Sequence, residues 1–388
     1  MSLKHLQDGP VYLDYNATTP VGPDVLDAML PYLTTHFGNP SSTHAYGRAA
    51  AAAVSTAREQ VASLIGAAAA DIVFTSSGSE ANTLAVRGAL LPALAAGRNH
   101  LVTQITEHPS ILRTAEALKR RHNVWVTYLP VDNHGHTDPA ALRAAVTDRT
   151  ALVSIQHANG ETGTLHPIAD LAAIAHEQGA LFHSDASQSI GKIPVDISAL
   201  GVDLLTLTGH KFHAPKGAAA LYLPNRFNFE PVIHGGGQER RQRAGTENVP
   251  ALVGLGAAST AAARLLPTEP RRQAHLRDTL HTLLDQTFPG RIRVNGHPIQ
   301  RLPNTLNVSI DGLIAADLLQ KAPGIAASTA AACNAGSRHH PSEVLLAMGV
   351  SEQHALGACR FSLGRWSDAP DAERAVGAIA QALGEAQA

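Results

Sequence analysis

Seven short apolar runs, separated by stretches with helical periodicity, occupy the chain between about residues 60 and 225. This alternation is typical of a mainly parallel β-sheet covered by helices on both faces. The predicted strands are Ile72 to Thr75, Leu101 to Thr103, Val124 to Tyr128, Ala151 to Ile155, Ala180 to His183, Leu204 to Leu207 and Ala219 to Leu223. Ligands bind outside the carboxyl ends of strands in such sheets, so the polar residues after each run are the candidates for function.

After a Gly-rich loop at Gly235 to Gly237, longer helical stretches replace the alternation. The predicted elements are helices from about Val249 to Phe288 and from about Ala369, and strands at Thr305 to Ile310 and Arg360 to Leu363. We therefore expect an α/β protein with two domains. The large domain takes residues 21–258, and residues 1–20 and 259–388 form a smaller α+β domain.

The composition narrows the class of protein. The chain has 388 residues with a formal net charge of -2 and no long basic run, so neither nucleic acid nor a membrane is expected as a partner. Met1 to Pro10 lacks an apolar core, and no apolar stretch reaches the roughly 20 residues that span a bilayer, so a cytoplasmic location is expected. The two cysteines form no CxxC pair, and no metal site is expected.

An amine and a carboxylate follow neighbouring apolar runs. Asp185 closes one run and Lys211 follows the next, so both side chains could meet at one edge of the sheet. A pyridoxal phosphate (PLP) site needs a lysine for the Schiff base and an acid for the pyridinium nitrogen. Gln188 follows Asp185, while Thr208 and His210 could hold phosphate and orient the amine. The alternatives are a structural salt bridge for Asp185 and a solvated strand end for Lys211.

Two further turns carry possible cofactor ligands. Gly78 and Ser79 would present main-chain amides and a hydroxyl at the positive end of a helix, where an anion could bind. Ser77 and Glu80 have the spacing of a capping box, and a plain cap explains this motif equally well. His108 follows the next run and could stack on an aromatic cofactor and transfer protons, although a hydrogen-bonded loop histidine is the alternative.

The two thiols differ in their surroundings. Cys333 lies in a segment of small residues that could be exposed, whereas Cys359 precedes an apolar strand and is expected to be buried as a small hydrophobe. A nucleophilic thiol must be accessible, so Cys333 is the candidate nucleophile. The loop from Gly235 to Asn248 combines glycine and arginine and suits either a site edge or a subunit contact.

These residues, taken with several motifs, resemble the cysteine desulfurases of the nitrogen-fixation type, within the class V group of fold-type-I PLP enzymes. Selenocysteine lyases share much of the pattern. The matching motifs are Leu13 to Pro20, Phe37 to Ser42, Thr106 to Pro109, Gly209 to Lys211, Arg243 to Asn248, Leu302 to Thr305 and Arg360 to Arg365. They extend over almost the whole chain.

The resemblance implies a role for each matching residue. Lys211 would form the Schiff base, Asp185 would pair with the pyridinium, Gln188 would bind the ring hydroxyl and His108 would stack on the ring. The implied phosphate ligands are Gly78, Ser79, Thr208 and His210, with Thr246 supplied by the partner subunit of a homodimer. Arg360 and Asn159 would bind the substrate, and Cys333 would take its sulfur as a persulfide.

The implied function is the removal of sulfur from L-cysteine, giving L-alanine and a persulfide for an acceptor protein in iron–sulfur cluster or other cofactor biosynthesis. The chain departs from the family pattern at Gly160, where an asparagine is usual, and around Cys333, where the segment to Pro341 is one residue longer and carries His339 and His340. The alternatives are therefore a selenocysteine lyase and a catalytically weak sulfur-relay or scaffold protein.

Overall fold

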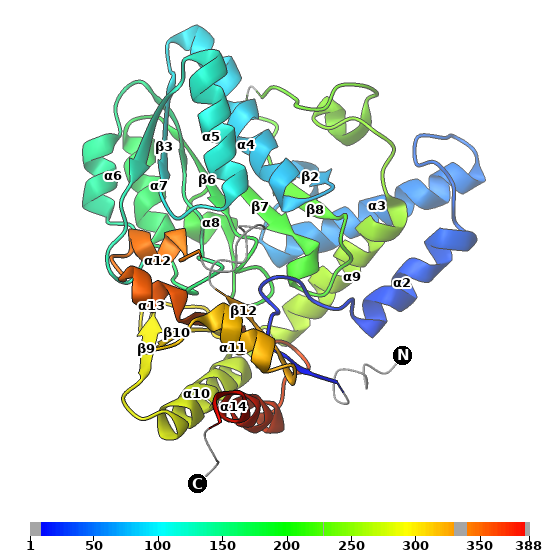
Figure 1. Cartoon of the computed structure of the whole chain (residues 1–388). Helices are drawn as coiled ribbons and strands as arrows, with labels where there is room; N and C mark the ends of the chain where they lie inside the picture. The colour runs from blue at the N-terminus through cyan, green and yellow to red at the C-terminus, as the bar shows by residue number, and fades with distance from the viewer. Residues whose placement is uncertain (1–8, 228, 330–339, 385–388) are drawn as a thin grey trace.

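The structure is a computed structural model that describes residues 9–227, 229–329 and 340–384. Its largest element is a seven-stranded sheet with the order β2-β8-β7-β6-β5-β3-β4. Neighbouring strands are parallel except where β8 pairs with β2 and β7. The strands are β2 (Ile72–Thr75), β3 (His100–Gln104), β4 (Trp125–Leu129), β5 (Thr150–Ser154), β6 (Leu181–Asp185), β7 (Leu204–Thr208) and β8 (Ala219–Tyr222). The predicted mainly parallel sheet is confirmed (Figure 1).

Strand ends differ from the prediction where pairing continues past the apolar run. β6 extends to Asp185 because Ser184 and Asp185 pair with Leu205 and Thr206 of β7. β13 (Ala358–Ser362) begins two residues before the predicted Arg360. Its first residues complete a ladder with the neighbouring strand. Main-chain hydrogen bonds to a neighbour, which the side-chain pattern does not report, therefore determine these ends.

Helices cover both faces of the large sheet. Val73 and Leu101 pack with α4 and α5 on one face, whereas Phe74 and Phe182 pack with α3, α7 and α9 on the other. Alternate residues of one strand thus enter different cores, as the two-residue period of a strand requires. The helices are α2 (Pro23–Thr34), α3 (Ala45–Leu64), α4 (Gly78–Ala93), α5 (Pro109–His122), α6 (Pro139–Ala145), α7 (Ile168–Glu177), α8 (Ile197–Leu200) and α9 (Val249–Leu265).

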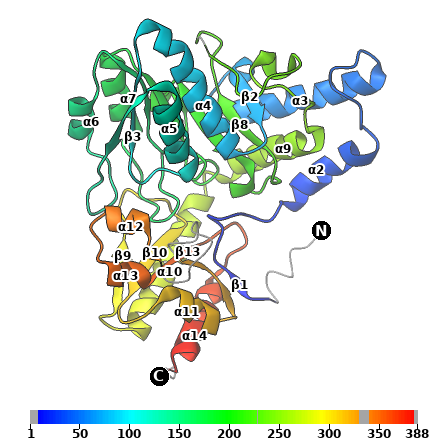
Figure 2. The ribbon, with the colours of Figure 1, turned by 45° about the horizontal axis from the view of Figure 1, so that its top comes forward.

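A second lobe lies beside the large sheet and has its own core (Figure 2). It contains a four-stranded antiparallel sheet with the order β12-β13-β10-β9, and the N-terminal strand β1 pairs in parallel with β11. Val11 and Leu13 join this core, so both ends of the chain share it. The elements are β1 (Val11–Tyr12), β9 (Ile292–Asn295), β10 (Thr305–Ile310), β11 (Ile325–Ala326), β12 (Ser328–Thr329), α10 (Glu269–Thr287), α11 (Ala315–Lys321), α12 (Glu343–Ala347), α13 (Glu352–Leu356) and α14 (Ala369–Leu383). The domain boundaries at residues 20/21 and 258/259 stay a prediction.

The helical stretch predicted from Val249 to Phe288 consists of α9 and α10, which are bent by 76° relative to each other. Leu252 and Leu255 of α9 pack into the core of the large sheet. Within the described ranges, no single helix is both long and apolar enough to cross a membrane; only α9 and α10 taken together would be.

An ion pair covers the outer edge of β2, which is the first strand of the sheet. The Glu239 carboxylate accepts two hydrogen bonds from Arg58, at 2.7 and 2.6 Å, and one from the main-chain N–H of Phe74, at 2.8 Å. Arg58 also donates to the main-chain oxygen of Ile72 at 2.7 Å. The pair thus satisfies main-chain groups that a further strand would otherwise bind, and it closes the edge to other chains.

The same contacts hold an unfavourable backbone. Glu239, Arg240 and Arg241 have φ values of 46°, 57° and 66°, in the left-handed region that residues other than glycine rarely adopt. Such residues persist only where surrounding contacts hold them. The buried Glu239 carboxylate therefore determines the course of the loop between Gly237 and Gln242.

We predict that Glu239→Gln lowers the free energy of unfolding by about 2 to 3 kcal/mol, because Arg58 and the edge of β2 lose a buried carboxylate. Urea denaturation measures this loss. The matched control is Glu177→Gln, which removes the carboxylate of an exposed pair with Arg143 and should leave stability unchanged. Equal losses in both variants would contradict the interpretation of the edge contact.

Candidate active site

The structure brings Asp185 and Lys211 to one edge of the large sheet. Asp185 is the last residue of β6, and Lys211 lies in the 3-10 turn η3 (Gly209–Lys211) directly after β7. β6 and β7 are parallel neighbours, with Asp185 opposite Thr206. The charges of Asp185 and Lys211 both act on the pKa of His108, so the three side chains lie near one another at this edge. The meeting of amine and carboxylate expected from the sequence is therefore present.

The Asp185 carboxylate is buried and held on both oxygens. Oδ2 accepts a hydrogen bond from Nδ2 of Asn82 at 2.7 Å, and Oδ1 accepts one from the main-chain N–H of Ser187 at 2.9 Å. Asn82 lies on α4 and also donates to Ser110 Oγ of α5 at 2.9 Å. Asn82 was not among the predicted site residues, because nothing in its local sequence distinguishes it from other polar helix residues. From α4, the Asn82 side chain fixes the orientation of the Asp185 carboxylate.

His108 caps the start of α5, with Nδ1 accepting from the main-chain N–H of Ser110 at 3.1 Å. This contact leaves the proton of the neutral ring on Nε2. Surrounding protein desolvates the ring and lowers the His108 pKa; Asp185 opposes this shift and Lys211 adds to it. A neutral, oriented imidazole is suited to lie on an aromatic ring and to exchange protons.

A cradle for an anion forms where α4 begins. Ser77 caps the helix by accepting from the N–H of Glu80 at 3.2 Å, and the Gly78 and Ser79 amides belong to the first turn, which has no acceptor within the helix. A Cβ on Gly78 would lie 3.3 Å from Ser187 Oγ and Thr208 Cβ, so the glycine lets the helix start approach the ends of β6 and β7 closely.

His210 borders this region from the turn that carries Lys211. Its Nδ1 lies 3.1 Å from Thr18 Oγ1, and burial together with Lys211 and Lys216 lowers its pKa to about 4. A neutral imidazole can still donate one hydrogen bond to a phosphate. The residues predicted to bind phosphate within one chain, Gly78, Ser79, Thr208 and His210, thus lie at neighbouring strand ends and at the start of α4.

Glu80 does not complete the predicted capping box. It accepts from the main-chain N–H of Ser76 at 2.9 Å and from Arg243 Nε at 2.8 Å. Although burial opposes it, the hydrogen bonds from Arg243 and Ser76 lower the Glu80 pKa. Arg243 thereby ties the loop before α9 to the cradle. Thr246 of that loop is exposed, and in the described residues no contact of the site involves it.

The Lys211 amine is hydrogen-bonded to the N-terminal segment. Its Nζ donates to the main-chain oxygen of Asn16 at 2.7 Å. Nε2 of Gln188 donates to the same oxygen at 3.1 Å. Asn16 is fully buried, and its main-chain N–H donates to Ser362 Oγ of β13 at 2.9 Å. The N-terminal segment therefore binds the Lys211 amine and at the same time contacts the second lobe.

Arg360 reaches the site from β13. One guanidinium nitrogen contacts Asp14 Oδ1 at 2.6 Å and another donates to the main-chain oxygen of Gly160 at 3.1 Å. Nε is buried without a partner among the described residues. These two contacts hold the Arg360 guanidinium while it remains only partly buried, so it can bind a carboxylate in a fixed orientation.

Asn159 serves mainly to shape its turn. Its Oδ1 accepts from the main-chain N–H groups of Glu161 and Thr162 at 2.9 and 3.0 Å, and Nδ2 donates to the Thr106 oxygen at 3.3 Å. At the next position, a Cβ on Gly160 would lie 2.7 Å from Gln188 Nε2. The glycine that departs from the family pattern thus makes room for Gln188, and its oxygen helps to hold Arg360.

Two buried carboxyl groups lie beneath the site. Burial raises the pKa of Glu107 to about 8, against hydrogen bonds from the Gln156 N–H and Gln104, and Asp185 adds to the rise. Burial also raises the pKa of Glu161 to about 7, against a hydrogen bond from Ser342 and the charge of Arg360. Asp185, whose two oxygens are held by donors, thus lies near a carboxyl group that burial keeps protonated.

The two thiols are placed very differently. Cys359 is completely buried on β13, and burial raises its pKa to about 12, so its predicted burial is confirmed. Cys333 and His339 lie outside the described residues. The flanking residues are placed: Ser328 of β12 lies opposite Arg360 on β13, and Ser342 hydrogen bonds to Glu161. Both flanks of the segment that contains Cys333 are therefore attached beside the site.

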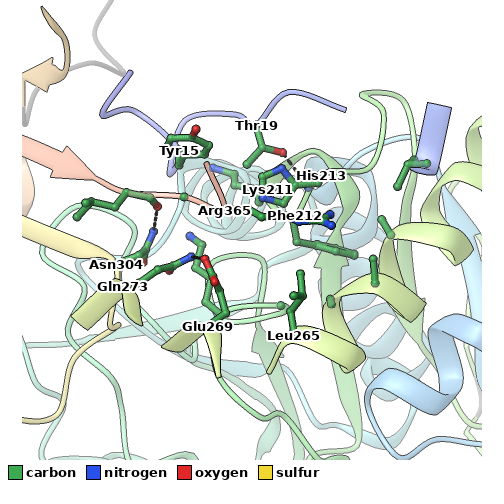
Figure 3. A pocket seen from close by; sticks show the side chains of 18 residues that line it. Tyr15, Thr19, Lys211, Phe212, His213, Leu265, Glu269, Gln273, Asn304 and Arg365 are labelled. Atoms are coloured by element: carbon green, nitrogen blue, oxygen red, sulfur yellow. Dashed lines mark hydrogen bonds between the residues drawn. The ribbon is translucent and has the colours of Figure 1, made fainter. Parts of the chain in front are cut away.

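A small cavity of about 40 Å³ adjoins Lys211. Tyr15 and Thr19 from the N-terminal segment face Phe212 and His213, and Glu269 with Gln273 of α10 complete the wall (Figure 3). The cavity is too small for a cofactor, and it shows that the lysine is packed between the two lobes. In the described residues, no group of three His, Cys, Asp or Glu side chains is arranged to hold a metal ion.

Comparison with known proteins gives consistent matches. The model of the family described as aminotransferase class-V matches residues 11–374. A cysteine desulfurase of Cereibacter sphaeroides is 47% identical over 368 residues, covering 94% of this chain and 93% of that protein. A cysteine desulfurase of Nostoc sp. is 45% identical over 369 residues, covering 94% and 91% of the two chains.

Solved structures agree with these matches. One described as a NifS-like protein superposes with a TM-score of 0.90 at 34% identity, covering 97% of this chain and 99% of that one. Another, described as SspA in complex with cysteine, has a TM-score of 0.81 at 34% identity and covers 92% of this chain and 99% of its own.

Glu107 predicts a pH dependence of stability. An acid whose pKa rises on folding, here from 4.5 to about 8, stabilises the fold below the lower value and loses that contribution as the pH rises through the higher one. Glu107→Gln keeps an acceptor for the Gln104 and Gln156 donors and removes the titration. We expect the variant to gain stability relative to the parent protein between pH 4.5 and 8.

Urea denaturation at the two ends of that pH range tests this prediction. The control is Glu59→Gln, an exposed glutamate on α3, for which the difference from the parent should not change with pH. Glu161 is present in all these proteins, so its own titration cancels. A Glu107→Gln difference that stays constant over the range would contradict the raised pKa.

Proposed function

Since this chain belongs to the class-V aminotransferase family, we propose that it is a PLP-dependent cysteine desulfurase, which takes sulfur from L-cysteine and leaves L-alanine. One observation carries the proposal: Lys211 and Asp185 stand at the ends of adjacent parallel strands, and Arg360 lies where the chain enters the segment containing Cys333. An amine, an acid, a carboxylate-binding fork and a thiol are the groups that this reaction requires.

The donor set fits PLP. The missing Cβ of Gly78 lets the start of α4 lie close to Ser187 and Thr208, Asp185 is a fixed acceptor, and desolvation favours a neutral His108 ring. In this arrangement Lys211 would hold the cofactor covalently, Asp185 would bind its ring nitrogen and Gln188 its ring hydroxyl. When bound, PLP supplies an electron-withdrawing ring that accepts the electron pair left as the substrate loses its α proton.

The chain positions the substrate and moves its proton. Arg360 would bind the substrate carboxylate, with Asp14 and the Gly160 oxygen fixing the direction of the fork. Lys211 would move the α proton with its Nζ, which is held by a hydrogen bond to the Asn16 main-chain oxygen. Asp185 would hold the ring nitrogen in its protonated form through charge and hydrogen bonding.

The sulfur step is assigned to Cys333. Its thiolate would attack the substrate sulfur, so that a sulfur–sulfur bond forms while the carbon–sulfur bond breaks, and the electron pair stays with the carbon fragment that becomes alanine. A buried thiol cannot perform this attack, which excludes Cys359. The described residues on either side of Cys333 support this assignment, since Ser328 pairs with Arg360 and Ser342 hydrogen bonds to Glu161.

The quaternary and cellular assignments extend this proposal. We assign the protein as a homodimer in which Thr246 binds the phosphate in the partner's site. We also assign it as a cytoplasmic enzyme. Its persulfide would pass to an acceptor protein for iron–sulfur cluster or other cofactor synthesis. The exposed position of Thr246, on a loop tied down by Arg243 and Glu239, supports the contact between copies.

The test of function is turnover. Alanine and sulfide release from cysteine is measured with a thiol reductant, beside alanine and selenide release from selenocysteine. Faster turnover of cysteine supports the desulfurase, whereas turnover of selenocysteine alone would assign the enzyme as a selenocysteine lyase. A protein that binds PLP but releases no alanine in a single turnover would be a relay or scaffold and would overturn the proposal.

Asp185→Asn should fold and bind PLP yet lose on the order of a hundredfold in turnover, because a neutral amide no longer supports a charged ring nitrogen. The variant should fold because Asn82 has a buried Oδ1 without a partner among the described residues. If the Asn82 amide rotates, this oxygen can accept a hydrogen bond from the amide introduced at position 185. Asp170→Asn, on the exposed face of α7, is the control. Near-normal turnover with normal PLP content would count against Asp185.

Cys333→Ser should still bind PLP and cysteine but release alanine at a small fraction of the parent rate, because a hydroxyl does not accept the sulfur. Cys359→Ser is the matched control: it should keep the sulfur chemistry and lose about 1 to 2 kcal/mol of stability, since a hydroxyl replaces a thiol in apolar packing. Mass spectrometry after incubation with cysteine locates the added sulfur. Its presence on the Cys359 peptide alone would refute the assignment.

A further inference from the structure

A second lysine is buried beside Lys211, and the mechanism above does not use it. Lys192 is 7% exposed and lies at the end of the turn that carries Gln188. Its Nζ donates to Gln188 Oε1 at 2.9 Å and to Asn16 Oδ1 at 2.7 Å. Burial, followed by the charges of Lys211 and Arg360, lowers the Lys192 pKa strongly. A lysine is rarely buried in this way unless its hydrogen bonds serve a purpose.

The contacts determine which way the Gln188 amide points. The main-chain oxygen of Asn16 can only accept, and it takes a hydrogen bond from Gln188 Nε2 at 3.1 Å. The Lys192 amine donates on the opposite side, so Oε1 must face it. A flipped amide would place oxygen against oxygen at Asn16. The Asn16 carbonyl oxygen therefore selects one of the two orientations, and the hydrogen bond from Lys192 to Oε1 supports it.

This orientation decides what Gln188 offers to the cofactor. Of the two hydrogens on Nε2, one goes to Asn16, and among the described residues the other has no acceptor in the protein. Gly160, where any Cβ would lie 2.7 Å from Nε2, keeps the space next to this nitrogen open. The nitrogen side of the amide is thus turned toward the site as a donor.

We propose that Lys192 is a positioning residue: it holds Gln188 with its NH₂ group toward the ring hydroxyl of PLP, and it steadies the Asn16 segment, whose main-chain oxygen accepts a hydrogen bond from Lys211. This inference rests on the proposed PLP function, and it assigns a role to a residue that the proposed mechanism does not use. Lys192 itself touches neither substrate nor cofactor in this arrangement. It acts through Gln188 and Asn16.

Asn16 connects this group to the second lobe. Its Oδ1 accepts from Asn304 at 3.0 Å as well as from Lys192, and its Nδ2 donates to Thr305 Oγ1 at 2.8 Å. Lys192 therefore binds a side chain that the second lobe also holds. Removing the amine leaves a buried oxygen with one donor fewer, but Asn304 still satisfies it, so the fold should survive the substitution.

The test is a double-mutant cycle on the holoenzyme, with Lys192→Met, Gln188→Leu and the double variant. PLP affinity is measured by cofactor dissociation, and the pH midpoint of the visible absorbance of bound PLP is measured by titration. Gln188→Leu should weaken PLP binding roughly tenfold, since one hydrogen bond to an ionised oxygen is lost. It should also raise the pH midpoint, because that donor stabilises the ionised ring hydroxyl.

Lys192→Met should reproduce most of both changes, and the double variant should match Gln188→Leu alone, because Lys192 acts through the amide. Effects that multiply in the double variant, or a Lys192→Met protein identical to the parent, would overturn the proposal. Lys321→Met removes an exposed lysine at the end of α11, in the second lobe, and should leave both readouts unchanged. A change equal to that of Lys192→Met would show a general charge effect and would also overturn it.

If Lys192→Met does not fold, Lys192→Gln replaces it in the same cycle, since its shorter side chain cannot reach both oxygens at once. Neither readout requires desulfurase activity. A parent protein that binds PLP but does not release alanine would refute the proposed function while the cycle still decides the role of Lys192. A parent protein that does not bind PLP would refute both.

Discussion

The site depends on one buried asparagine. Asn16 accepts on its main-chain oxygen from Lys211 and Gln188, and its side chain contacts Lys192. The same residue binds the second lobe through Asn304, Thr305 and Ser362. Because a buried amide is costly to leave without partners, the contacts that Asn16 makes with the site and with the second lobe support one another. The position of the catalytic amine is thus coupled to the packing of the two lobes against the N-terminal segment.

Burial and hydrogen bonding act differently on the ionisable side chains of the site. Asp185 is held by Asn82 and Ser187, so its carboxylate is a fixed acceptor, whereas Glu107 beneath it has a pKa raised to about 8 by burial. Two neighbouring carboxyl groups cannot both be ionised cheaply in a buried place, and Asp185 adds to the rise in the Glu107 pKa that burial causes. Desolvation lowers the pKa of His108, which favours the neutral ring that can lie against a cofactor without adding a further charge.

The family departure at Gly160 changes the site less than the sequence alone indicates. The main-chain oxygen at that position holds Arg360, and the missing side chain leaves room for Gln188. A glycine contributes an oxygen as well as any other residue, because the carbonyl belongs to the backbone. The orientation of the carboxylate-binding fork is therefore maintained by Asp14 and Gly160 together, and the substitution gives no structural reason to expect a weak enzyme.

The sequence by itself determined that the large sheet has these seven strands, because short apolar runs follow from local periodicity, whereas main-chain pairing decided where several of them end. It also identified Lys211, Asp185 and the burial of Cys359. Only the tertiary structure revealed Asn82, Lys192 and the Arg58–Glu239 pair, whose partners lie 103, 176 and 181 residues away. The two-residue strands β1, β11 and β12 were likewise invisible, since they have no period of their own. Local patterns report which surfaces are apolar, but the partner of a buried polar group is decided by how distant segments pack.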